Sequence, residues 1–474
     1  MSTLILGFGK TGRALYDYLK SENDYVKNGL LLIYDDLAEQ VNDLQDENAV
    51  FFNKQNEEIL FDKYFKDIKQ CIISPGIARN HNIILKLKKQ NISIYGEIEF
   101  AYKNLKKKDS KIIAITGTNG KTTTATLCKS AIDKAGLGGK TFVGGNLGVP
   151  FISGVKDKDF EDFILEISSF QLEWVYDFKP DIAVLLNIED DHLDRYINFD
   201  EYRLMKYKLF KNLKYNDVAV LNQGDYNSYV LKGVIGSNAI VYGFDENKCD
   251  VFYKDGVMRL RLKDICGFDA DISLKNVVDK RKFVIEDMMA AACSLILYGI
   301  APDIIKGAFE DYKLLRHRVE YIGNIENIDF YDDSKATNPS AVISALGSFD
   351  LLNGGGEGAG IVLILGGKDK GFDYECMVEP IKRSVKACVL MGETKEILEN
   401  VLNGHMDLIT ADDMEDAVKK SFNYLKNNIK AGGAGTVLLS PASSSFDMFK
   451  DYNERGDVFR KCFEKLKNNF FEKV

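Results

Sequence analysis

A glycine-containing turn between an apolar run and three threonines is the segment of this sequence best suited to chemistry. It reads IIAITGTNGKTTT over residues 112–124. Its glycines let backbone amides approach phosphate oxygens, and a helix that follows directs its positive end toward them. Lys121 would reach the outer phosphates of a nucleotide, and the Thr122 hydroxyl would bind magnesium. We therefore predict an ATP-binding loop, with Mg²⁺ as cofactor, made of Gly117, Thr118, Asn119, Gly120, Lys121, Thr122 and Thr123.

Two more polar positions follow apolar runs that read as buried strands. Glu166 lies in FILEIS (163–168), and His192 follows IAVLLNI (182–188) in a run that also holds Asp190 and Asp191. In a doubly wound sheet both would face the same edge as the phosphate loop. Magnesium on a triphosphate takes few protein ligands and keeps several waters. Glu166 and Thr122 would therefore suffice for one ion.

A second glycine turn, GFGKTG at residues 7–12, follows the first apolar run, and Asp35 and Asp36 come after the next one. NAD and UDP-linked ligands both place a diphosphate at a helix amino terminus and a ribose or base near an acid. Because a separate ATP loop lies downstream, a UDP moiety is the more economical interpretation. We expect Gly9, Thr11, Asp35 and Asp36 to contact it.

The elements that must position these residues have the pattern of an α/β protein. Apolar runs alternate with helical patterns, which predicts mainly parallel sheets covered by helices. The runs are TLILGFG, LLLIYDD, QCIISPG, NISIYGE, KIIAITG, NIDFYDDS, IVLILGG, ACVLMG and TVLLSPA. A lysine-rich connector near residue 109 and the LLRHRVEYIG segment predict boundaries between three domains, 1–109, 110–315 and 316–474. The stretch NGGGEGAG at 353–360 is expected to be a surface loop.

Composition narrows the class of protein. The chain has 474 residues, 45% of them hydrophobic and 28% charged, without an apolar run that could span a bilayer. A net charge of −9 disfavours nucleic-acid binding, which requires a basic surface. The eight cysteines form no CxxC pair, which argues against a zinc site or a disulfide framework. We expect a cytoplasmic protein that is not inserted in a membrane.

The phosphate loop departs from the common P-loop because Ile115 stands where a further glycine is usual. Its short form, TGTNGKT, resembles the loop of the Mur ligases and of their folylpolyglutamate synthase relatives. The segment LLNIEDDHLDRY (185–196) matches a second Mur ligase motif, and the resemblance extends over nearly the whole chain. It implies a Rossmann-like amino-terminal domain, a central ATPase domain with a mainly parallel sheet, and a Rossmann-like carboxyl-terminal domain.

The resemblance also implies a second metal ion and a modified lysine. His192 would help to hold a second Mg²⁺, and Lys206 in EYRLMKYKLF corresponds to the family lysine that is carbamylated. A carbamate turns a cation into an anionic oxygen ligand for a metal. The metal set is then Thr122, Glu166, His192 and Lys206. Without the resemblance Lys206 is an ordinary helix lysine, and Lys208 is a competing candidate.

For ATP and the reacting groups, the resemblance points to the start of the third domain. It places Arg318 near the ATP phosphates, Asp333 at the ribose and Lys335 beside the reacting carboxylate. With Lys121, His192 and Lys206, Lys335 completes the predicted catalytic set. An ion pair between Arg318 and Glu320 is the structural alternative. Asp287 stands where related enzymes have an asparagine that contacts adenine, which leaves the base contacts open.

For the substrates, the resemblance implies contacts at both ends of the chain. Thr337, Lys370, Ser445 and Phe446 match positions around D-glutamate, and Tyr452 replaces an expected phenylalanine. The SPGI motif, with Ser74, Pro75 and Gly76, favours the D-glutamate-adding branch. Asn146, in GGN, and Ser168 would contact the sugar–peptide portion.

The implied activity is ATP-dependent ligation of D-glutamate to UDP-N-acetylmuramoyl-L-alanine through an acyl phosphate, by a monomer. The alternatives are a sister ligase for another amino acid, a folylpolyglutamate synthase-like enzyme, and a nucleotide-dependent switch without ligase activity.

Overall fold

The computed structural model describes residues 2–22, 30–37, 49–107, 109–146, 148–157, 159–192, 195–235, 238–277, 280–313, 316–352, 360–429 and 433–471. Residues 353–359 of the expected glycine-rich loop lie outside these ranges, and Gly360 begins a strand. The chain forms two compact units. The first comprises Met1–Ile188, Asp200–Val277 and Glu286–Tyr312, and the second comprises Glu189–Phe199, Val278–Ile285 and Lys313–Val474.

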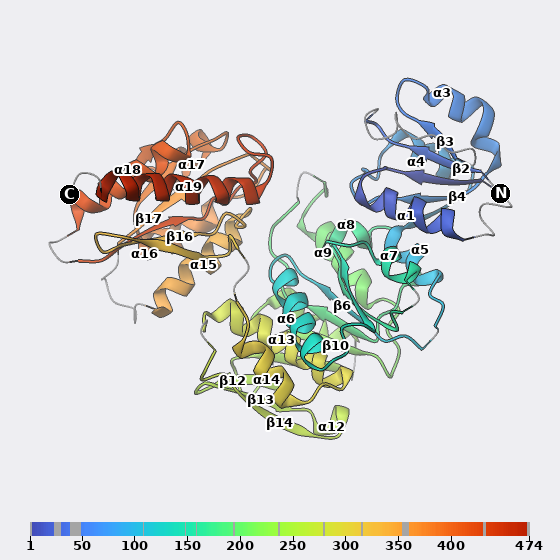
Figure 1. Cartoon of the computed structure of the whole chain (residues 1–474), viewed down its shortest axis with the longest axis horizontal. Helices are drawn as coiled ribbons and strands as arrows, with labels where there is room; N and C mark the ends of the chain where they lie inside the picture. Colours follow the sequence, from blue (N-terminus) through green and yellow to red (C-terminus); the bar gives the residue numbers. More distant parts are fainter. Residues whose placement is uncertain are drawn as a thin grey trace. The chain divides into compact units, whose positions relative to one another are not determined.

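The first unit begins with a five-stranded sheet in the order β3-β2-β1-β4-β5, in which all pairs are parallel (Figure 1). Its strands are β1 (Ser2–Leu6), β2 (Leu31–Tyr34), β3 (Ala49–Phe52), β4 (Ile68–Ile73) and β5 (Ser93–Gly96). Its helices are α1 (Lys10–Ser21), α3 (Glu57–Ile59), α4 (Asn82–Lys89) and α5 (Glu97–Lys103), with single turns η2 (Leu60–Tyr64) and η3 (Phe65–Asp67). Strands buried on both faces are nearly continuous in hydrophobic residues, which explains why β1 and β2 were predictable from their sequences.

A nine-stranded sheet in the order β14-β13-β12-β11-β10-β9-β6-β8-β7 forms the rest of the first unit. Its strands are β6 (Ile112–Thr116), β7 (Thr141–Gly145), β8 (Asp162–Glu166), β9 (Ile182–Leu185), β10 (Val218–Asn222), β11 (Ala239–Gly243), β12 (Val251–Lys254), β13 (Val257–Arg261) and β14 (Asp269–Ser273). The pairs from β7 to β12 are parallel, and β12-β13-β14 are antiparallel. The phosphate loop follows β6, a central strand, so it lies at the carboxyl edge of this sheet.

The helices that accompany the nine-stranded sheet are α6 (Lys121–Lys134), α7 (Phe151–Lys156), α8 (Ser169–Leu172), α9 (Phe199–Tyr207), η4 (Lys208–Phe210), α10 (Tyr226–Val230), α11 (Lys232–Ile235), α12 (Lys263–Cys266), α13 (Lys282–Tyr298) and α14 (Pro302–Glu310). α13 is apolar around its circumference, and residues Met288–Cys293 are completely buried. A helix that is hydrophobic on every side belongs in the interior of a domain.

The second unit contains a six-stranded sheet in the order β15-β16-β20-β17-β18-β19. Its strands are β15 (Glu320–Ile325), β16 (Ile328–Asp332), β17 (Gly360–Leu365), β18 (Val385–Leu390), β19 (Asp407–Thr410) and β20 (Gly435–Leu439). Only the β15–β16 pair is antiparallel. The helices are α15 (Pro339–Leu352), η5 (Glu375–Met377), α16 (Val378–Ser384), α17 (Lys395–Leu402), α18 (Met414–Asn428) and α19 (Tyr452–Phe471).

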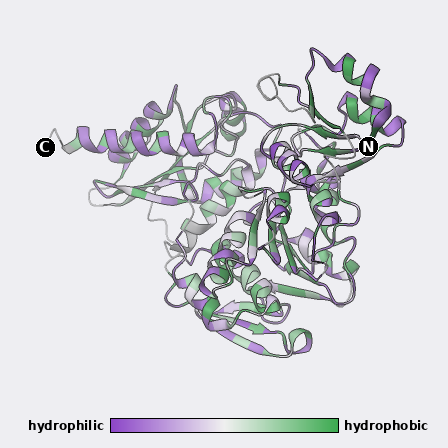
Figure 2. Cartoon of the chain, turned by 45° about the vertical axis from the view of Figure 1, so that its right-hand side comes forward, coloured by the Kyte–Doolittle hydropathy of each residue, from purple (hydrophilic) through white to green (hydrophobic). Residues whose placement is uncertain are grey.

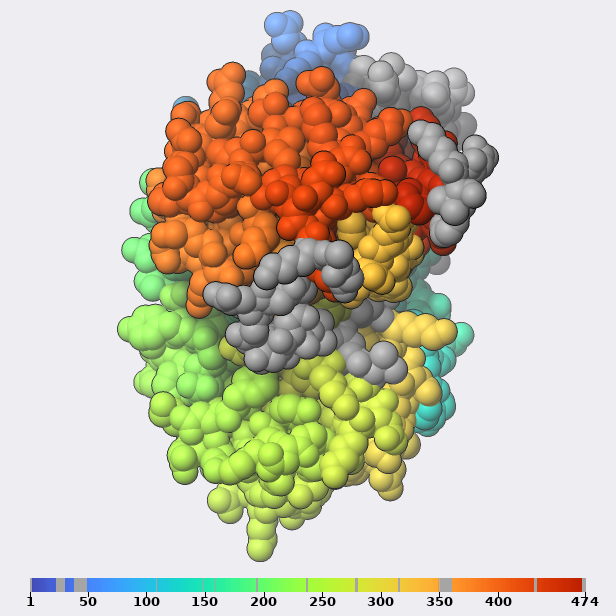
Figure 3. Space-filling model, turned by 90° about the vertical axis from the view of Figure 1, so that its left-hand side faces the viewer, coloured from blue at the N-terminus to red at the C-terminus, as the bar shows by residue number. Residues whose placement is uncertain are grey.

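Two hydrophobic cores cover opposite faces of this sheet. One includes buried residues of α15, α16 and α17, and the other includes buried residues of α18 and α19. Hydrophilic and hydrophobic bands alternate along α19 (Figure 2). Phe459 and Phe463 lie on its apolar face and are buried in the second core. In Figure 3 the orange atoms of the segment with α16 to α18 make up much of this unit's visible surface.

The predicted α/β class with mainly parallel sheets is confirmed by this architecture. All eight cysteines are free thiols, and five of them are buried. Within the described ranges, no helix is both long and apolar enough to cross a bilayer.

Candidate active site

The phosphate loop lies between β6 and α6, and its geometry requires glycine. Gly120 precedes the first turn of α6 with φ +86°, a conformation that favours glycine. A Cβ at Gly120 would lie 2.2 Å from Oδ1 of Asp287, which comes from α13. The Thr124 hydroxyl donates to the Gly120 carbonyl (3.2 Å) and lies 3.4 Å from the same carboxylate oxygen. Asp287, predicted at the adenine, therefore borders the phosphate loop.

Asn187, just beyond β9, holds the loop in place. Its backbone carbonyl accepts the amide of Thr118 (3.0 Å), and its side-chain oxygen accepts the amide of Asn119 (2.8 Å). The Thr118 hydroxyl lies 3.0 Å from the Tyr202 hydroxyl on α9. Neither Asn187 nor Tyr202 belongs to the predicted set of site residues. The spacing of Tyr202 one helical turn before Lys206 was the available signal.

Two lysine ammonium groups contact the same carbonyl oxygen of the loop. Lys121 Nζ donates to the carbonyls of Gly117 and Thr118, each at 2.7 Å. Lys206 Nζ donates to the Gly117 carbonyl at 2.9 Å, and the Lys206 side chain is buried. Positive charge is therefore concentrated at the loop, which suits an anionic ligand.

The competing lysine, Lys208, lies elsewhere. Its Nζ donates to the Glu173 carbonyl at 2.7 Å, and burial, aided by the charge of Arg79, lowers its pKa. Of the two candidates only Lys206 touches the phosphate loop in the described structure. Its carbamylation stays a prediction.

Glu166 ends β8, and its backbone pairs in register with Ile115 of β6. Its side chain is buried, and Oε1 accepts from the Asn146 amide nitrogen at 2.7 Å. Among the described residues, Oε2 has no hydrogen-bond partner. A buried carboxylate oxygen without a partner is costly unless something else satisfies it. A hard cation would do so, and the donor set therefore fits magnesium.

The amino-terminal turn is tightly packed. Gly7 has φ +91°, and a Cβ on Gly12 would lie 2.0 Å from the Gly7 carbonyl oxygen. The Ser74 hydroxyl donates to that same carbonyl at 2.8 Å, which joins the SPGI segment to the turn. Apart from its chain neighbours, no atom of the described residues lies within 4 Å of a Cβ built on Gly9, so Gly9 and the amino terminus of α1 leave room for a ligand.

The two acidic residues after β2 differ in their surroundings. Both carboxylate oxygens of Asp35 accept backbone amides, from Phe8 (2.5 Å) and Leu37 (2.9 Å). Asp36 is one-third exposed and lies 3.2 Å from the Tyr34 hydroxyl and 3.5 Å from His81 Nε2. Asp35 therefore shapes the turn, whereas Asp36 has a carboxylate open to solvent. His81 does not belong to the predicted set, because no motif contains it.

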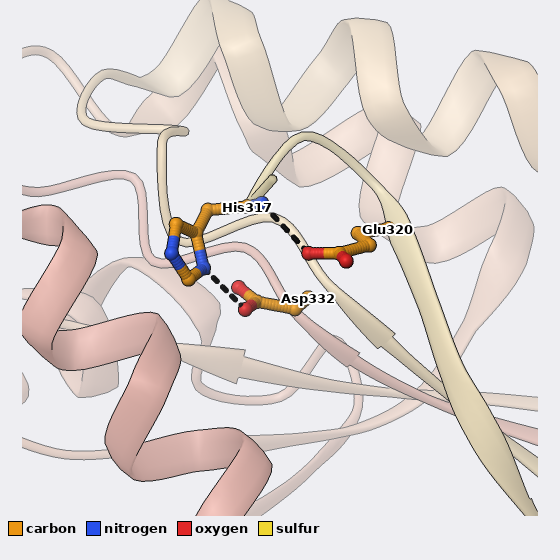
Figure 4. Close-up of side chains that lie close together, drawn as sticks. All are labelled: His317, Glu320 and Asp332. Carbon is orange, nitrogen blue, oxygen red and sulfur yellow. Dashed lines mark hydrogen bonds and ion pairs between the residues drawn. The ribbon is translucent and has the colours of Figure 1, made fainter. Parts of the chain in front are cut away.

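The second unit has its own polar cluster, around the start of β15 and the end of β16. His317 Nδ1 lies 2.7 Å from Asp332 Oδ2, and the His317 amide donates to Glu320 at 3.0 Å (Figure 4). Glu320 also accepts from Arg460 at 2.7 Å. His317 is buried with φ +63°, so the hydrogen bonds fix an uncommon backbone conformation directly before Arg318.

Asp333, predicted at the ATP ribose, is almost completely buried. It accepts from the Ser440 hydroxyl (2.7 Å) and the Val319 amide (3.2 Å). Burial raises its pKa to about 7, although the Ser440 hydroxyl and the charge of Arg318 oppose the shift. The Arg318 guanidinium lies 5.4 Å from the centre of the Phe283 ring, at the beginning of α13.

Asp191 connects the predicted metal segment to the predicted amino-acid site. It lies 3.6 Å from His192 Nε2, 3.9 Å from Lys370 Nζ and 3.5 Å from the Asn338 amide nitrogen. All four residues belong to the second unit. The structure thus places Lys370 near the segment that carries His192, as a shared substrate site would require.

The remaining predicted residues of the second unit lie on neighbouring loops. The Lys335 ammonium lies 5.5 Å from the centre of the Tyr452 ring, so the tyrosine that replaces the expected phenylalanine supports a predicted catalytic lysine. Ser445 is buried, whereas Phe446 is 66% exposed. Thr337 is half-buried, in the loop between β16 and α15.

In the first unit, Ser168 caps α8 with Gln171, so its hydroxyl has a structural partner. Pro75 and Gly76 follow Ser74 at the surface.

Comparisons with known proteins identify the family of this chain. The sequence model of the Mur ligase middle domain matches residues 115–295, and that of the Mur ligase glutamate ligase domain matches residues 317–442. A UDP-N-acetylmuramoylalanine--D-glutamate ligase of Geotalea uraniireducens is 36% identical over 98% of this chain and 97% of its own. One of a Thermoanaerobacter species is 33% identical over 98% of both chains.

The solved structure of MurF ligase from Thermotoga maritima in complex with ADP has the same fold, with a TM-score of 0.58 and 15% identity. It covers 98% of this chain and 95% of its own. This chain belongs to the Mur ligase family. The predicted family and the predicted class of enzyme, an ATP-dependent amide-bond-forming ligase, are confirmed.

Proposed function

We propose that the chain joins D-glutamate to UDP-N-acetylmuramoyl-L-alanine in peptidoglycan precursor synthesis. The observation that carries the proposal is the concentration of charge at the phosphate loop. Lys121 and Lys206 share the Gly117 carbonyl, and Glu166 ends the strand next to β6 with one carboxylate oxygen unsatisfied. Such a site suits the transfer of a phosphoryl group to a carboxylate. The relatives named for D-glutamate support the choice of amino acid.

In this proposal the terminal carboxylate of the UDP-linked substrate attacks the γ-phosphorus of ATP, and ADP leaves. The amine of D-glutamate then attacks the acyl phosphate and displaces phosphate. Gly117 to Thr123 bind the triphosphate, and Lys121 stabilises the charge on the transferred group. Thr122, Glu166 and His192 would hold two magnesium ions, which neutralise phosphate charge, and carbamylation of Lys206 would replace its positive charge at Gly117 with a further anionic oxygen ligand for them.

The remaining predicted groups bind ATP and D-glutamate. Arg318 and Asp333 contact ATP, and Asp287 contributes to the nucleotide site from α13. Lys335 lies by the reacting carboxylate, and Lys370, Thr337, Ser445 and Phe446 bind D-glutamate. A dicarboxylate requires cations and hydroxyl or amide donors, which lysine, serine and threonine provide.

The first sheet binds the UDP portion through Gly9, Thr11, Asp35, Asp36 and the SPGI segment, and Asn146 and Ser168 contact the sugar–peptide portion. Since both Asp35 carboxylate oxygens accept backbone amides, its contact would be less direct than that of Asp36. We also infer a cytoplasmic monomer. The domain boundaries after residues 109 and 315 stay a prediction.

Phosphate release tests the proposal. Purified protein is given ATP, Mg²⁺ and UDP-N-acetylmuramoyl-L-alanine, with one amino acid at a time, and D-glutamate should give the highest rate. Lys121→Ala should lower the rate by about 100-fold or more, because a cation at the transferred group is lost. Lys129→Ala is the matched control, since this lysine lies on the same helix, exposed and paired with Asp133. Near-normal ligation by Lys121→Ala would contradict the assignment, and a different preferred amino acid would indicate a sister ligase.

A further inference from the structure

A buried glutamate outside the proposed site holds one end of a loop that leads into it. Glu97 begins α5, directly after the first sheet, and its side chain is 2% exposed. Oε1 accepts the amide of Ile152, in the first turn of α7, at 2.7 Å. Oε2 has no hydrogen-bond partner among the described residues, and burial raises the pKa of Glu97 to about 7.

The segment before α7 connects this contact to Glu166. The Asn146 amide donates to the Glu166 carbonyl (2.8 Å), and its side-chain nitrogen donates to Glu166 Oε1 (2.7 Å). The Gly145 amide donates to the Val149 carbonyl at 2.7 Å, immediately before α7. A Cβ on Gly145 would lie 2.4 Å from the Glu166 carbonyl oxygen, so the backbone at this end of the loop packs directly against β8.

α5 has a second anchor that does not depend on Glu97. The Glu99 carboxylate is completely buried and accepts the amides of Tyr176 (2.9 Å) and Phe178 (3.0 Å). α5 is therefore already attached to the segment after α8. Glu97 is therefore not needed to attach α5, and its carboxylate serves the amino terminus of α7 instead.

We propose that Glu97 is a positioning residue for the metal ligand Glu166. By fixing the first turn of α7 it holds Gly145, Asn146 and Val149 in place beside β8, so that Asn146 can orient the Glu166 carboxylate. Residues that orient a metal ligand influence metal affinity without touching the ion. The inference rests on the proposed role of Glu166 in binding magnesium.

Metal binding by the full chain tests this inference without an activity assay. Mn²⁺ serves as the probe, and its binding in the presence of ADP is measured by electron paramagnetic resonance. Glu97→Ala should weaken Mn²⁺ binding about fivefold, the size expected when a helix cap is lost. Glu97→Asp should weaken it in the same direction because the shorter side chain cannot reach the Ile152 amide, and it serves if the alanine variant does not fold. Glu97→Gln should stay within about twofold, since its amide oxygen can still accept that hydrogen bond.

Two controls distinguish a positioning role of Glu97 from a general loss of stability and from failure of the proposed metal site. Asp413 caps α18 in the second unit, so Asp413→Ala also removes a capping carboxylate. It should lower thermal stability and leave Mn²⁺ binding unchanged. Glu166→Gln should abolish the binding, and normal binding by that variant would refute the metal site itself. If Glu166→Gln loses Mn²⁺ while Glu97→Ala and Glu97→Asp bind it like the unmodified chain, the role of Glu97 is refuted and the metal site stands.

Discussion

Replacing Asp333 by asparagine should stabilise the second unit, and the gain should grow with pH. Asp333 is 4% exposed, and burial raises its pKa from 3.8 to about 7. Its two hydrogen bonds, from the Ser440 hydroxyl and the Val319 amide, do not fully offset the loss of hydration of a charged carboxylate. Asparagine has nearly the same shape. It can accept from the Val319 amide and donate to the Ser440 hydroxyl oxygen.

The magnitude follows from proton linkage. Below the ordinary pKa of 3.8 the carboxyl is protonated in both the folded and the unfolded chain, and its ionisation costs nothing. Between 3.8 and about 7 the folded chain keeps the proton that the unfolded chain releases, so stability falls as pH rises. The full shift of the Asp333 pKa corresponds to roughly 4 kcal/mol of unfolding free energy, as an upper value. The Asp333→Asn chain should therefore be only slightly more stable than the unmodified chain at pH about 4. Its gain in unfolding free energy should approach that value near pH 8.

Amide hydrogen exchange of peptides that cover β16 and β20 gives the free energy of opening of this sheet at each pH. The control is Asp329→Asn, a half-exposed carboxylate on β16, the strand that ends directly before Asp333, with Asn324 and Tyr321 as partners. Because this side chain is partly open to solvent, its replacement should change the free energy of opening far less than Asp333→Asn does. The same gain for Asp333→Asn at every pH would refute the reasoning, because a charge penalty must vanish where the carboxyl is protonated.

Two further substitutions test the packing around the site. Gly12→Ala should destabilise the first sheet by about 3 kcal/mol and weaken binding of the UDP-linked substrate, because its Cβ would lie 2.0 Å from the Gly7 carbonyl oxygen. Thermal unfolding measures the loss of stability, and a binding titration measures the loss of affinity. The control is Gly9→Ala, because a Cβ on Gly9 has no other atom of the described residues within 4 Å apart from its chain neighbours. A Gly12→Ala chain as stable as the Gly9→Ala chain would contradict the assigned packing. Arg455→Lys should cost about 3 kcal/mol. The buried guanidinium donates to the Ser334 hydroxyl, the Ser334 carbonyl and the Ser443 carbonyl, and an ammonium cannot reach all three; unchanged thermal unfolding would rule this out.

The parts of the site that could be predicted from the sequence are those encoded locally. The phosphate loop needs glycine and an amino-terminal helix turn next to a buried strand, and all of these lie within residues 112–124. Many apolar strands of the parallel sheets were predictable for the same reason. By contrast, β12 to β15, which form the antiparallel pairs, were not identified, and β3, β7, β10, β11 and β19 also went unrecognised.

Contacts between segments that are far apart in the sequence could not be predicted from local patterns. Lys206 and Lys208 are two positions apart and chemically identical, and only the packing of α9 decides which one reaches the Gly117 carbonyl. Asp35 was expected to bind a ligand, but whether its oxygens are engaged depends on where the backbone of the preceding turn passes. The position of Asp287 beside Gly120 likewise depends on α13 crossing the loop, which no local pattern encodes.

The position of β20 in the third sheet affects how the chain can fold as the ribosome makes it. The first sheet has β1 at its centre, so later strands can add to it on either side as they emerge. The third sheet has its last strand between β16 and β17, which do not pair with each other. Until Gly435–Leu439 has been synthesised, β15–β16 and β17–β18–β19 are two separate ribbons with unpaired edges. A nascent chain that stalls within α18 therefore exposes strand edges that chaperones would have to shield.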